Sequence, residues 1–231
     1  MESIIIKPAV TVSGEISVPG DKSISHRSIM LGAIANGVTA VRGFLRGEDN
    51  ISTMQAFRSM GVDIEDDGEV IKINGNGLYG LKEPSDVLDC GNSGTTIRLI
   101  TGLLSGQSFF SVLTGDKYLR KRPMKRVVEP LSLMGADISG RNGATLAPLA
   151  INGGKLKGIT YQSPVYSAQI KSSIMLAGLY AEGETNVIEP SLSRDHSERM
   201  FRLFGASLDV NNDGVTVRGG VELSAREVIV P

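Results

Sequence analysis

The stretch Met60-Gly61-Val62-Asp63-Ile64 recurs as Met134-Gly135-Ala136-Asp137-Ile138 and as Phe204-Gly205-Ala206-Ser207-Leu208, at intervals of about 70 residues. Copies at this spacing account for nearly the whole chain of 231 residues. A fixed period of this kind indicates a fold built from similar units. We therefore expect a single domain over residues 1–231, made of three repeats at about 15–80, 85–155 and 160–222.

The same order of elements surrounds each copy of this stretch. After it come a short strand, a polar turn and a strand of β-branched residues, and the turns are Asp66-Asp67-Gly68, Arg141-Asn142-Gly143 and Asn212-Asp213-Gly214. Asp-Gly or Asn-Gly between apolar runs predicts a β-hairpin. Before the copies lie segments that mix charge with an apolar stripe, which predicts surface helices near residues 50–60, 122–134 and 195–204.

A second type of helix is predicted near the start of each repeat. Residues 25–36, 93–104 and 168–181 are apolar or small on nearly every side, which is typical of helices in a protein interior. Strand-like segments follow at residues 38–41, 109–113 and 185–188. The fold class that we predict is α/β, a pseudo-threefold repeat of βαβαββ units with three buried helices.

Composition excludes several classes of function. The formal net charge of −1 gives no general attraction to nucleic acid or to anionic membranes, so we expect neither as a partner. The chain contains no apolar run of about 18 residues and no signal peptide, which favours the cytoplasm. Cys90, His26 and His196 provide neither a disulfide nor a zinc-ligand spacing. The sequence therefore indicates neither metal nor redox chemistry.

Polar residues occupy the starts of the predicted interior helices, where apolar residues would be expected. The three starts read Gly20-Asp21-Lys22-Ser23-Ile24-Ser25-His26-Arg27, Gly91-Asn92-Ser93-Gly94-Thr95-Thr96-Ile97-Arg98 and Ser167-Ala168-Gln169-Ile170-Lys171. If the repeats are related by rotation, these N-termini meet at one end of the domain, where free N–H groups and helix dipoles attract anions. With Lys22 and Arg27 added, the sequence predicts a site for a small polyanion that carries phosphate or carboxylate. Neutral donors that orient this ligand would be Ser23, Ser167 and Gln169.

A structural explanation of the same residues also exists. Serine and asparagine are ordinary N-cap residues, and Arg27 and Arg98 can extend along a helix surface to reach water. The basic residues between Lys117 and Arg126 are explained mostly as a solvated helix face. The recurrence of the pattern at three helix starts favours the binding site.

The residues at these helix starts resemble the signatures of a known family, the EPSP (5-enolpyruvylshikimate-3-phosphate) synthases. Pro19-Gly20-Asp21-Lys22-Ser23-Ile24-Ser25-His26-Arg27-Ser28 resembles their N-terminal signature, and residues 89–99, Asp-Cys-Gly-Asn-Ser-Gly-Thr-Thr-Ile-Arg-Leu, resemble their glycine-rich signature. Further similar stretches are Arg120-Lys121-Arg122-Pro123-Met124, Ser167-Ala168-Gln169-Ile170-Lys171-Ser172 and Ser193-Arg194-Asp195-His196. The resemblance runs from end to end, and the Ser-Ala-Gln form is similar to the class II branch.

This resemblance implies an activity and a set of site residues. The family transfers the enolpyruvyl group of phosphoenolpyruvate (PEP) to the 5-hydroxyl of shikimate 3-phosphate, releases phosphate and uses no cofactor. The residues implied for shikimate 3-phosphate are Lys22, Ser23 and Arg27, with Ser23 and Arg27 at the carboxylate side, and Ser167, Ala168, Gln169 and Arg194 at the 3-phosphate side. Those implied for PEP are Lys22, Gly94, Arg122 and Gln169. Glyphosate would compete for the PEP position, and glycine at position 94 implies sensitivity to it.

Family members are about twice as long as this chain and place their catalytic residues in a C-terminal half. The resemblance therefore implies that this chain is the N-terminal, substrate-binding half, with the C-terminal domain as its missing partner. Lys22 is then the nearest candidate for a catalytic residue in this chain. Residues 1–14, with a strand near 4–11, and residues 224–231 would be interdomain segments. We expect both ends to be loose or paired with another copy, because an exposed apolar strand edge invites pairing.

Three other features of the sequence also resemble parts of functional sites. Gly75-Asn76-Gly77-Leu78-Tyr79-Gly80 fits the G-x-G-x-x-G pattern, but no convincing helix follows it, so a dinucleotide site is not expected. Cys90 is interpreted as a small buried residue rather than a nucleophile. His26 is interpreted as a packing residue, whereas His196 lies in a stretch that would assist a phosphate site.

Three hypotheses about function remain open at this point. The chain is part of an enzyme whose proton-transfer groups lie in the other half, or it is a module that captures shikimate 3-phosphate without turnover. In the third, the chain folds, but its helix starts are too loose to bind anything until the partner closes over them.

Overall fold

The computed structural model describes residues 3–5, 7–191 and 193–231, and its main feature is a strand arrangement that occurs in three sheets. In each sheet an inner strand pairs with a parallel strand on one side and with an antiparallel strand on the other. The antiparallel strand pairs in turn with its hairpin partner at the edge of the sheet. The first sheet contains β14 (Leu223–Ser224) and β15 (Glu227–Ile229), β1 (Ala35–Arg42), β3 (Val70–Asn76) and β2 (Asp63–Asp66). The second contains β4 (Leu88–Asp89), β5 (Phe110–Thr114), β7 (Leu146–Asn152) and β6 (Asp137–Gly140), and the third β9 (Thr160–Gln162), β11 (Glu184–Ile188), β13 (Gly214–Arg218) and β12 (Leu208–Val210).

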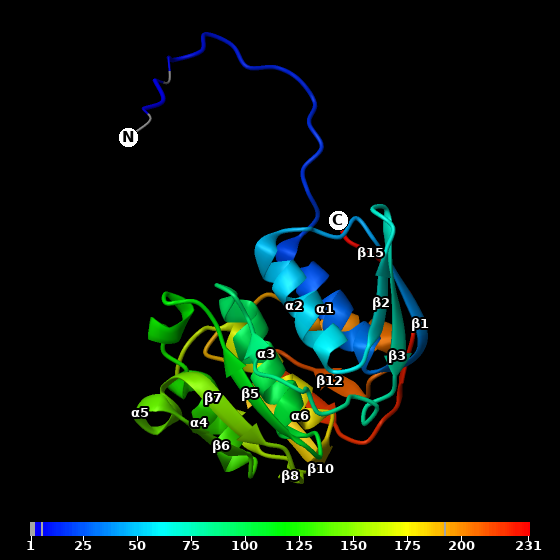
Figure 1. The fold of residues 1–231 in the computed structure, drawn as a ribbon, viewed down its shortest axis with the longest axis vertical. Helices are drawn as coiled ribbons and strands as arrows, with labels where there is room; N and C mark the ends of the chain where they lie inside the picture. The colour runs from blue at the N-terminus through cyan, green and yellow to red at the C-terminus, as the bar shows by residue number, and fades with distance from the viewer. Residues whose placement is uncertain (1–2, 6, 192) are drawn as a thin grey trace.

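Two sets of helices accompany these sheets (Figure 1). The interior set is α1 (Lys22–Ala33), α3 (Gly94–Ser105) and α6 (Ala168–Gly178), and the outer set is α2 (Glu48–Ser59), α4 (Lys125–Leu133) and α7 (His196–Phe204). Short elements are the 3-10 turn η1 (Leu119–Lys121), the helical turn α5 (Arg141–Ala144), and the parallel pair β8 (Leu156–Lys157) and β10 (Ala181–Glu182). The predicted α/β fold with repeated units and buried helices is confirmed.

The recurring Met-Gly or Phe-Gly stretch ends the outer helices. Gly61, Gly135 and Gly205 have φ angles of 83°, 95° and 88°, a left-handed conformation that glycine adopts without strain. The large residue before each glycine is buried. The chain therefore leaves each outer helix in a fixed direction and enters the strand of the next hairpin.

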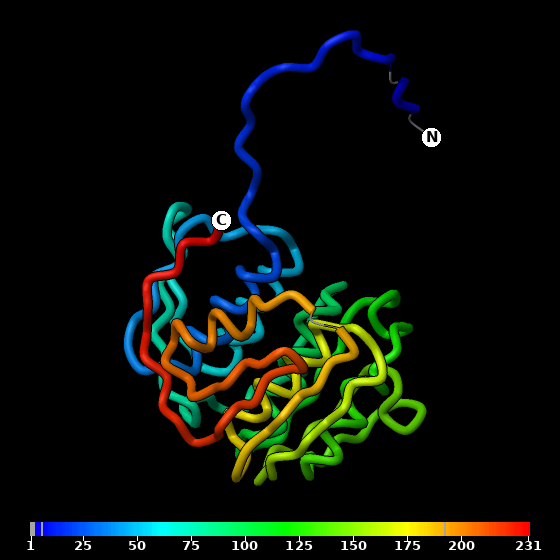
Figure 2. The backbone as a smooth tube through the Cα atoms, turned by 180° about the vertical axis from the view of Figure 1, so that it is seen from behind, coloured from blue at the N-terminus to red at the C-terminus, as the bar shows by residue number. Residues whose placement is uncertain are grey.

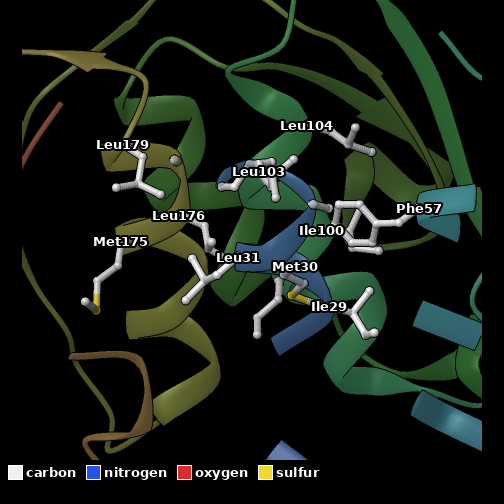
Figure 3. Close-up of a cluster of buried hydrophobic side chains, with 14 of the residues drawn as sticks. Ile29, Met30, Leu31, Phe57, Ile100, Leu103, Leu104, Met175, Leu176 and Leu179 are labelled. Carbon is white, nitrogen blue, oxygen red and sulfur yellow. The ribbon is translucent and has the colours of Figure 1, made fainter. Parts of the chain in front are cut away.

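The hydrophobic core lies where the three interior helices meet. Figure 3 shows Leu31 of α1, Leu103 of α3 and Leu176 of α6 among the side chains gathered there. Burial of each such side chain stabilises the fold by about 1.5–3 kcal/mol. A Cβ atom at Gly102 would lie 2.1 Å from the carbonyl oxygen of Ser173, so glycine permits the close approach of α3 and α6. This close packing fixes the helix starts relative to one another.

The C-terminal segment differs from our expectation. β15 pairs in parallel with β1, Val228 and Val230 are buried, and the Asp21 amide donates to the Pro231 carbonyl at 2.9 Å. Figure 2 shows this red segment running along the first sheet. The prediction of a loose or externally paired C-terminal end is therefore wrong. The physical reason is that the first repeat has no opening strand of its own before α1, and the C-terminal segment provides this parallel strand.

The N-terminal segment takes no part in a sheet. Residues 3–5 and 7–20 form no strand, and they lead away from the rest of the chain (Figure 1). Their apolar side chains, including Ile4, Val12 and Ile16, are exposed. The strand predicted near residues 4–11 is therefore not formed at the described positions, and Ile6 lies outside the described residues.

No helix precedes α3 after the glycine-rich stretch that follows β3, so the structure provides no dinucleotide-binding turn there. Cys90 is fully buried, and burial raises the pKa of its thiol, which confirms the packing interpretation. Within the described part of the chain, no helix is long and apolar enough to cross a membrane, and no cluster of metal-ligating side chains is present.

Candidate functional site

The three interior helices begin with a capping residue whose side chain accepts a backbone hydrogen bond. The acceptors are Asp21, Ser93 and Ser167, and the distances to the amides of Ile24, Thr96 and Ile170 are 2.8, 3.1 and 3.5 Å. The capping interpretation is therefore confirmed for Ser93 and Ser167, whereas the cap of α1 is Asp21 and Asn92 caps no helix. Capping by one side chain leaves the first N–H groups of each helix free, because these groups have no intrahelical partner. Two positions after the caps lie Ser23, Thr95 and Gln169.

Direct contacts show that these helix starts meet. The Gln169 side-chain amide donates to the Thr95 hydroxyl at 3.1 Å, which joins α6 to α3. The Arg27 guanidinium donates to the Ser172 hydroxyl at 2.5 Å, which joins α1 to α6. A small recess lies at this junction, lined by Ser23, Arg27, Thr95, Ala168, Gln169, Arg194 and His196. The expectation that three helix N-termini converge at one end is confirmed.

A neighbouring recess extends the same surface. It is lined by Tyr166, Ser167, Ala168, Gln169 and Arg194. The two recesses together contain every residue predicted for shikimate 3-phosphate except Lys22. The described residues that line them include the cations Arg27 and Arg194 and no carboxylate, which favours an anionic ligand.

Arg27 contributes a buried positive charge to this site. Its guanidinium donates to the hydroxyls of Ser197 (2.7 Å) and Ser172 (2.5 Å) and to the carbonyl of Ser23 (3.0 Å), all of which are uncharged. Burial lowers the pKa of Arg27 to about 10, and the Glu198 carboxylate opposes this shift. The group therefore remains charged at neutral pH and can attract an anion.

Three of the four residues predicted to face PEP, all except Lys22, form a second cluster beside the start of α3. A Cβ atom at Gly94 would lie 2.9 Å from a guanidinium nitrogen of Arg98 and 3.0 Å from one of Arg122. Arg98 also donates to the side-chain oxygen of Gln169 at 2.8 Å. Burial and the charges of Arg126 and Arg122 lower the pKa of Arg98 to about 10. Gly94, Arg122 and Gln169 are thus brought together around Arg98.

Lys22 is placed differently from the other predicted residues. It occupies the first turn of α1, but its ammonium group pairs with the Asp49 carboxylate of α2. Half of its side chain is exposed to solvent. It does not line the recess that contains Ser23, so a ligand would have to draw it away from Asp49.

Lys171 also departs from the expectation drawn from the sequence. Like Arg27 and Arg98, it is a cation near the start of an interior helix, but its side chain points into the interior and is only 1% exposed. Its ammonium nitrogen lies 2.8 Å from Glu189 and 2.5 Å from Glu198. Lys171 is therefore neutralised by direct ion pairs, whereas among the described residues Arg27 and Arg98 form none.

The two histidines have different surroundings. His26 bonds through Nδ1 to the Thr53 hydroxyl at 2.7 Å, and burial lowers its pKa to about 3, so it is a neutral packing residue as predicted. His196 lines the recess, and its Nδ1 lies 3.8 Å from the Asp21 carboxylate. Burial lowers the pKa of His196, and Asp21 opposes this shift.

Sequence reasoning missed Thr95 as a residue of the recess. Aligning the three helices by their caps would have found it, because it occupies the same position as Ser23 and Gln169. Arg98 was noticed as a cation but given no role, and its contact with Gln169 could not be read from spacing.

Comparisons with known proteins agree on one family. The sequence model of EPSP synthase (3-phosphoshikimate 1-carboxyvinyltransferase) matches residues 6–231. Two curated relatives are the 3-phosphoshikimate 1-carboxyvinyltransferases of Pelobacter propionicus, 73% identical over 100% of this chain, and of Geotalea daltonii, 70% identical over 97% of it. The match spans 54% and 52% of their own lengths. The chain thus spans about half the length of the curated relatives it matches.

Solved structures give the same result. An EPSP synthase structure from Acinetobacter baumannii superimposes with a TM-score of 0.91 and 53% sequence identity. The match covers 94% of this chain and 49% of that one. Family model, sequence relatives and fold therefore coincide, and the chain belongs to the EPSP synthase family.

Proposed function

We propose that this chain is the shikimate-3-phosphate-binding half of a cytoplasmic enolpyruvyl transferase. The complete enzyme would transfer the enolpyruvyl group of PEP to the 5-hydroxyl of shikimate 3-phosphate and release phosphate. The chain alone would bind shikimate 3-phosphate without turnover. The observation that carries this proposal is the convergence of three capped helix N-termini on a recess that holds Arg27 and Arg194.

The charges of the ligand fit the two sides of the recess. Shikimate 3-phosphate carries a carboxylate and a phosphate on one ring. Ser23 and Arg27 would take the carboxylate side, and free N–H groups at the start of α6 would join Ser167, Gln169 and Arg194 at the phosphate. The oxygens of both anions accept the charge-assisted hydrogen bonds that these groups donate.

PEP would bind beside Gly94. The missing side chain there leaves room for phosphate at the start of α3, next to the guanidinium groups of Arg98 and Arg122. Gln169 is held by Arg98 and reaches toward Thr95, so it would lie between the two ligands. Lys22 would complete this side after exchanging Asp49 for an anionic ligand.

The described residues of the recess explain binding better than turnover. Enolpyruvyl transfer needs a proton donor and acceptor at the reacting atoms. The arginine, serine, threonine and glutamine side chains of the recess provide electrostatic orientation rather than proton transfer, and among its described lining residues only His196 exchanges protons near neutral pH. We assign the remaining proton transfer to a C-terminal domain, which would be the partner of this chain.

The release of phosphate from shikimate 3-phosphate plus PEP tests this division of labour. We expect no phosphate release from the chain alone above the rate without protein, and release when a C-terminal half from a full-length relative is added. Turnover by the chain alone would show that catalytic groups lie within it. No turnover in the combined sample, when both parts are folded and associated, would contradict the proposed activity.

A further inference from the structure

Three buried charged groups lie behind the recess and take no part in its lining. The Lys171 ammonium nitrogen is 2.8 Å from Glu189 Oε2 and 2.5 Å from Glu198 Oε1, and the three side chains are 1%, 1% and 6% exposed. Removing charges from water is unfavourable unless their pairing is close. Lys171, Glu189 and Glu198, here called the Lys171 clamp, therefore form one electrostatic unit.

The Lys171 clamp joins three elements of the third repeat. Lys171 belongs to the first turns of α6, Glu189 follows β11 directly, and Glu198 lies in the first turn of α7. The segment between β11 and α7 carries Arg194, which lines both recesses. A single ammonium group thus holds both ends of this segment against the start of α6.

Glu189 makes a second contact that bears on the same segment. Its Oε2 atom, which pairs with Lys171, also accepts a hydrogen bond from the Ser193 amide at 3.3 Å. Ser193 directly precedes Arg194. The position of the Arg194 backbone is therefore linked to the Lys171 clamp through one hydrogen bond.

Arg27 is held by neighbouring but separate contacts. It donates to the hydroxyls of Ser172 and Ser197, which also lie 2.6 Å from each other. These hydroxyl contacts involve no member of the Lys171 clamp, and the clamp member whose charge attracts Arg27, Glu198, is kept in the variant described below. A change in the clamp should therefore disturb Arg194 more than Arg27.

We infer that Lys171 and Glu189 are positioning residues that hold Arg194 at the 3-phosphate side and thereby set the preference for phosphorylated over unphosphorylated ligand. This inference rests on the proposed function. Loss of the positioning should weaken the binding of shikimate 3-phosphate and leave the binding of shikimate nearly unchanged. If Lys171 and Glu189 had a purely structural role, their loss would weaken the binding of both ligands to the same degree.

The double variant Lys171→Met/Glu189→Gln tests this inference while keeping the buried charges balanced. The charges of Arg27, Lys171, Glu189 and Glu198 sum to zero in the wild type, and those of Arg27 and Glu198, which remain in the variant, also sum to zero. Glu184→Gln/Arg218→Met is the matched control, because it removes one positive and one negative charge from the exposed ion pairs that Arg218 forms with Glu184 and Asp209 in the third sheet. Dissociation constants for shikimate 3-phosphate and shikimate are measured for each protein.

We expect the clamp variant to lose about tenfold or more in affinity for shikimate 3-phosphate, as for the loss of one charge-assisted contact. For shikimate we expect the dissociation constant to change by less than about threefold, well below the change expected for shikimate 3-phosphate. The control should match the wild type for both ligands. Equal weakening of both ligands, or no weakening, would overturn the inference.

Hydrogen exchange at the Ser193 amide provides a second measurement that needs no ligand. Exchange should become faster in the clamp variant than in the control, because the amide loses its charged acceptor. Unchanged exchange in a folded clamp variant would also overturn the inference. If the wild type binds neither ligand, the proposed function fails, and the exchange experiment still decides whether the Lys171 clamp holds the segment.

Discussion

Replacing Arg27 with alanine should weaken the binding of shikimate 3-phosphate by more than about tenfold, since charge-assisted hydrogen bonds contribute about 1.5–3 kcal/mol each. Arg27 is buried at the recess, and its three hydrogen bonds go to uncharged oxygens, so its charge is available to the ligand carboxylate. Calorimetric titration of the variant measures the effect. Arg27→Lys should give an intermediate loss, because lysine keeps the charge but not the planar donor geometry.

Arg46→Ala is the matched control for this experiment. Arg46 pairs with Asp66 of β2, and neither residue lines the recess. Its removal should leave the dissociation constant unchanged. An Arg27→Ala variant that is folded and binds as tightly as the wild type would show that Arg27 has only a structural role.

Lys171→Met should produce the largest loss of stability, about 3–5 kcal/mol, which is the range for removing one partner of a buried ion pair. The variant leaves two carboxylates, Glu189 and Glu198, buried near each other without their shared cation. Methionine is close to lysine in length, so the loss comes from charge rather than from an empty cavity. Urea denaturation of the variant and the wild type measures the difference.

The double variant Lys171→Met/Glu189→Gln should recover part of this loss, because one of the two unpaired charges is then removed. A loss below about 1 kcal/mol in Lys171→Met would be typical of an exposed pair. It would contradict the buried, mutually dependent arrangement of these three side chains.

Much of the fold could be predicted because its repeats have local physical causes. The ends of the outer helices require a left-handed backbone at positions 61, 135 and 205, and the sequence shows this requirement as a glycine that recurs in each repeat. The hairpins after them depend on short turns of suitable residues. The parallel pairing of β15 with β1 could not be predicted in this way, because it joins residues nearly two hundred positions apart.

The candidate site could be predicted in part for the same reason. Polar residues and cations near helix starts are local signals, and they located Ser23, Arg27 and Gln169 at the recess. The direction of a long side chain depends instead on its neighbours in space. Spacing alone therefore could not show that Lys171 turns toward two buried carboxylates, or that Lys22 pairs with Asp49.

Calorimetric titration of shikimate 3-phosphate into the purified 231-residue chain, at low and moderate salt, tests the central claim most directly. The account predicts saturable one-to-one binding that weakens as salt increases, because the ligand is an anion and the recess is positive. No heat of binding at either salt concentration, from a chain shown to be folded, would contradict it.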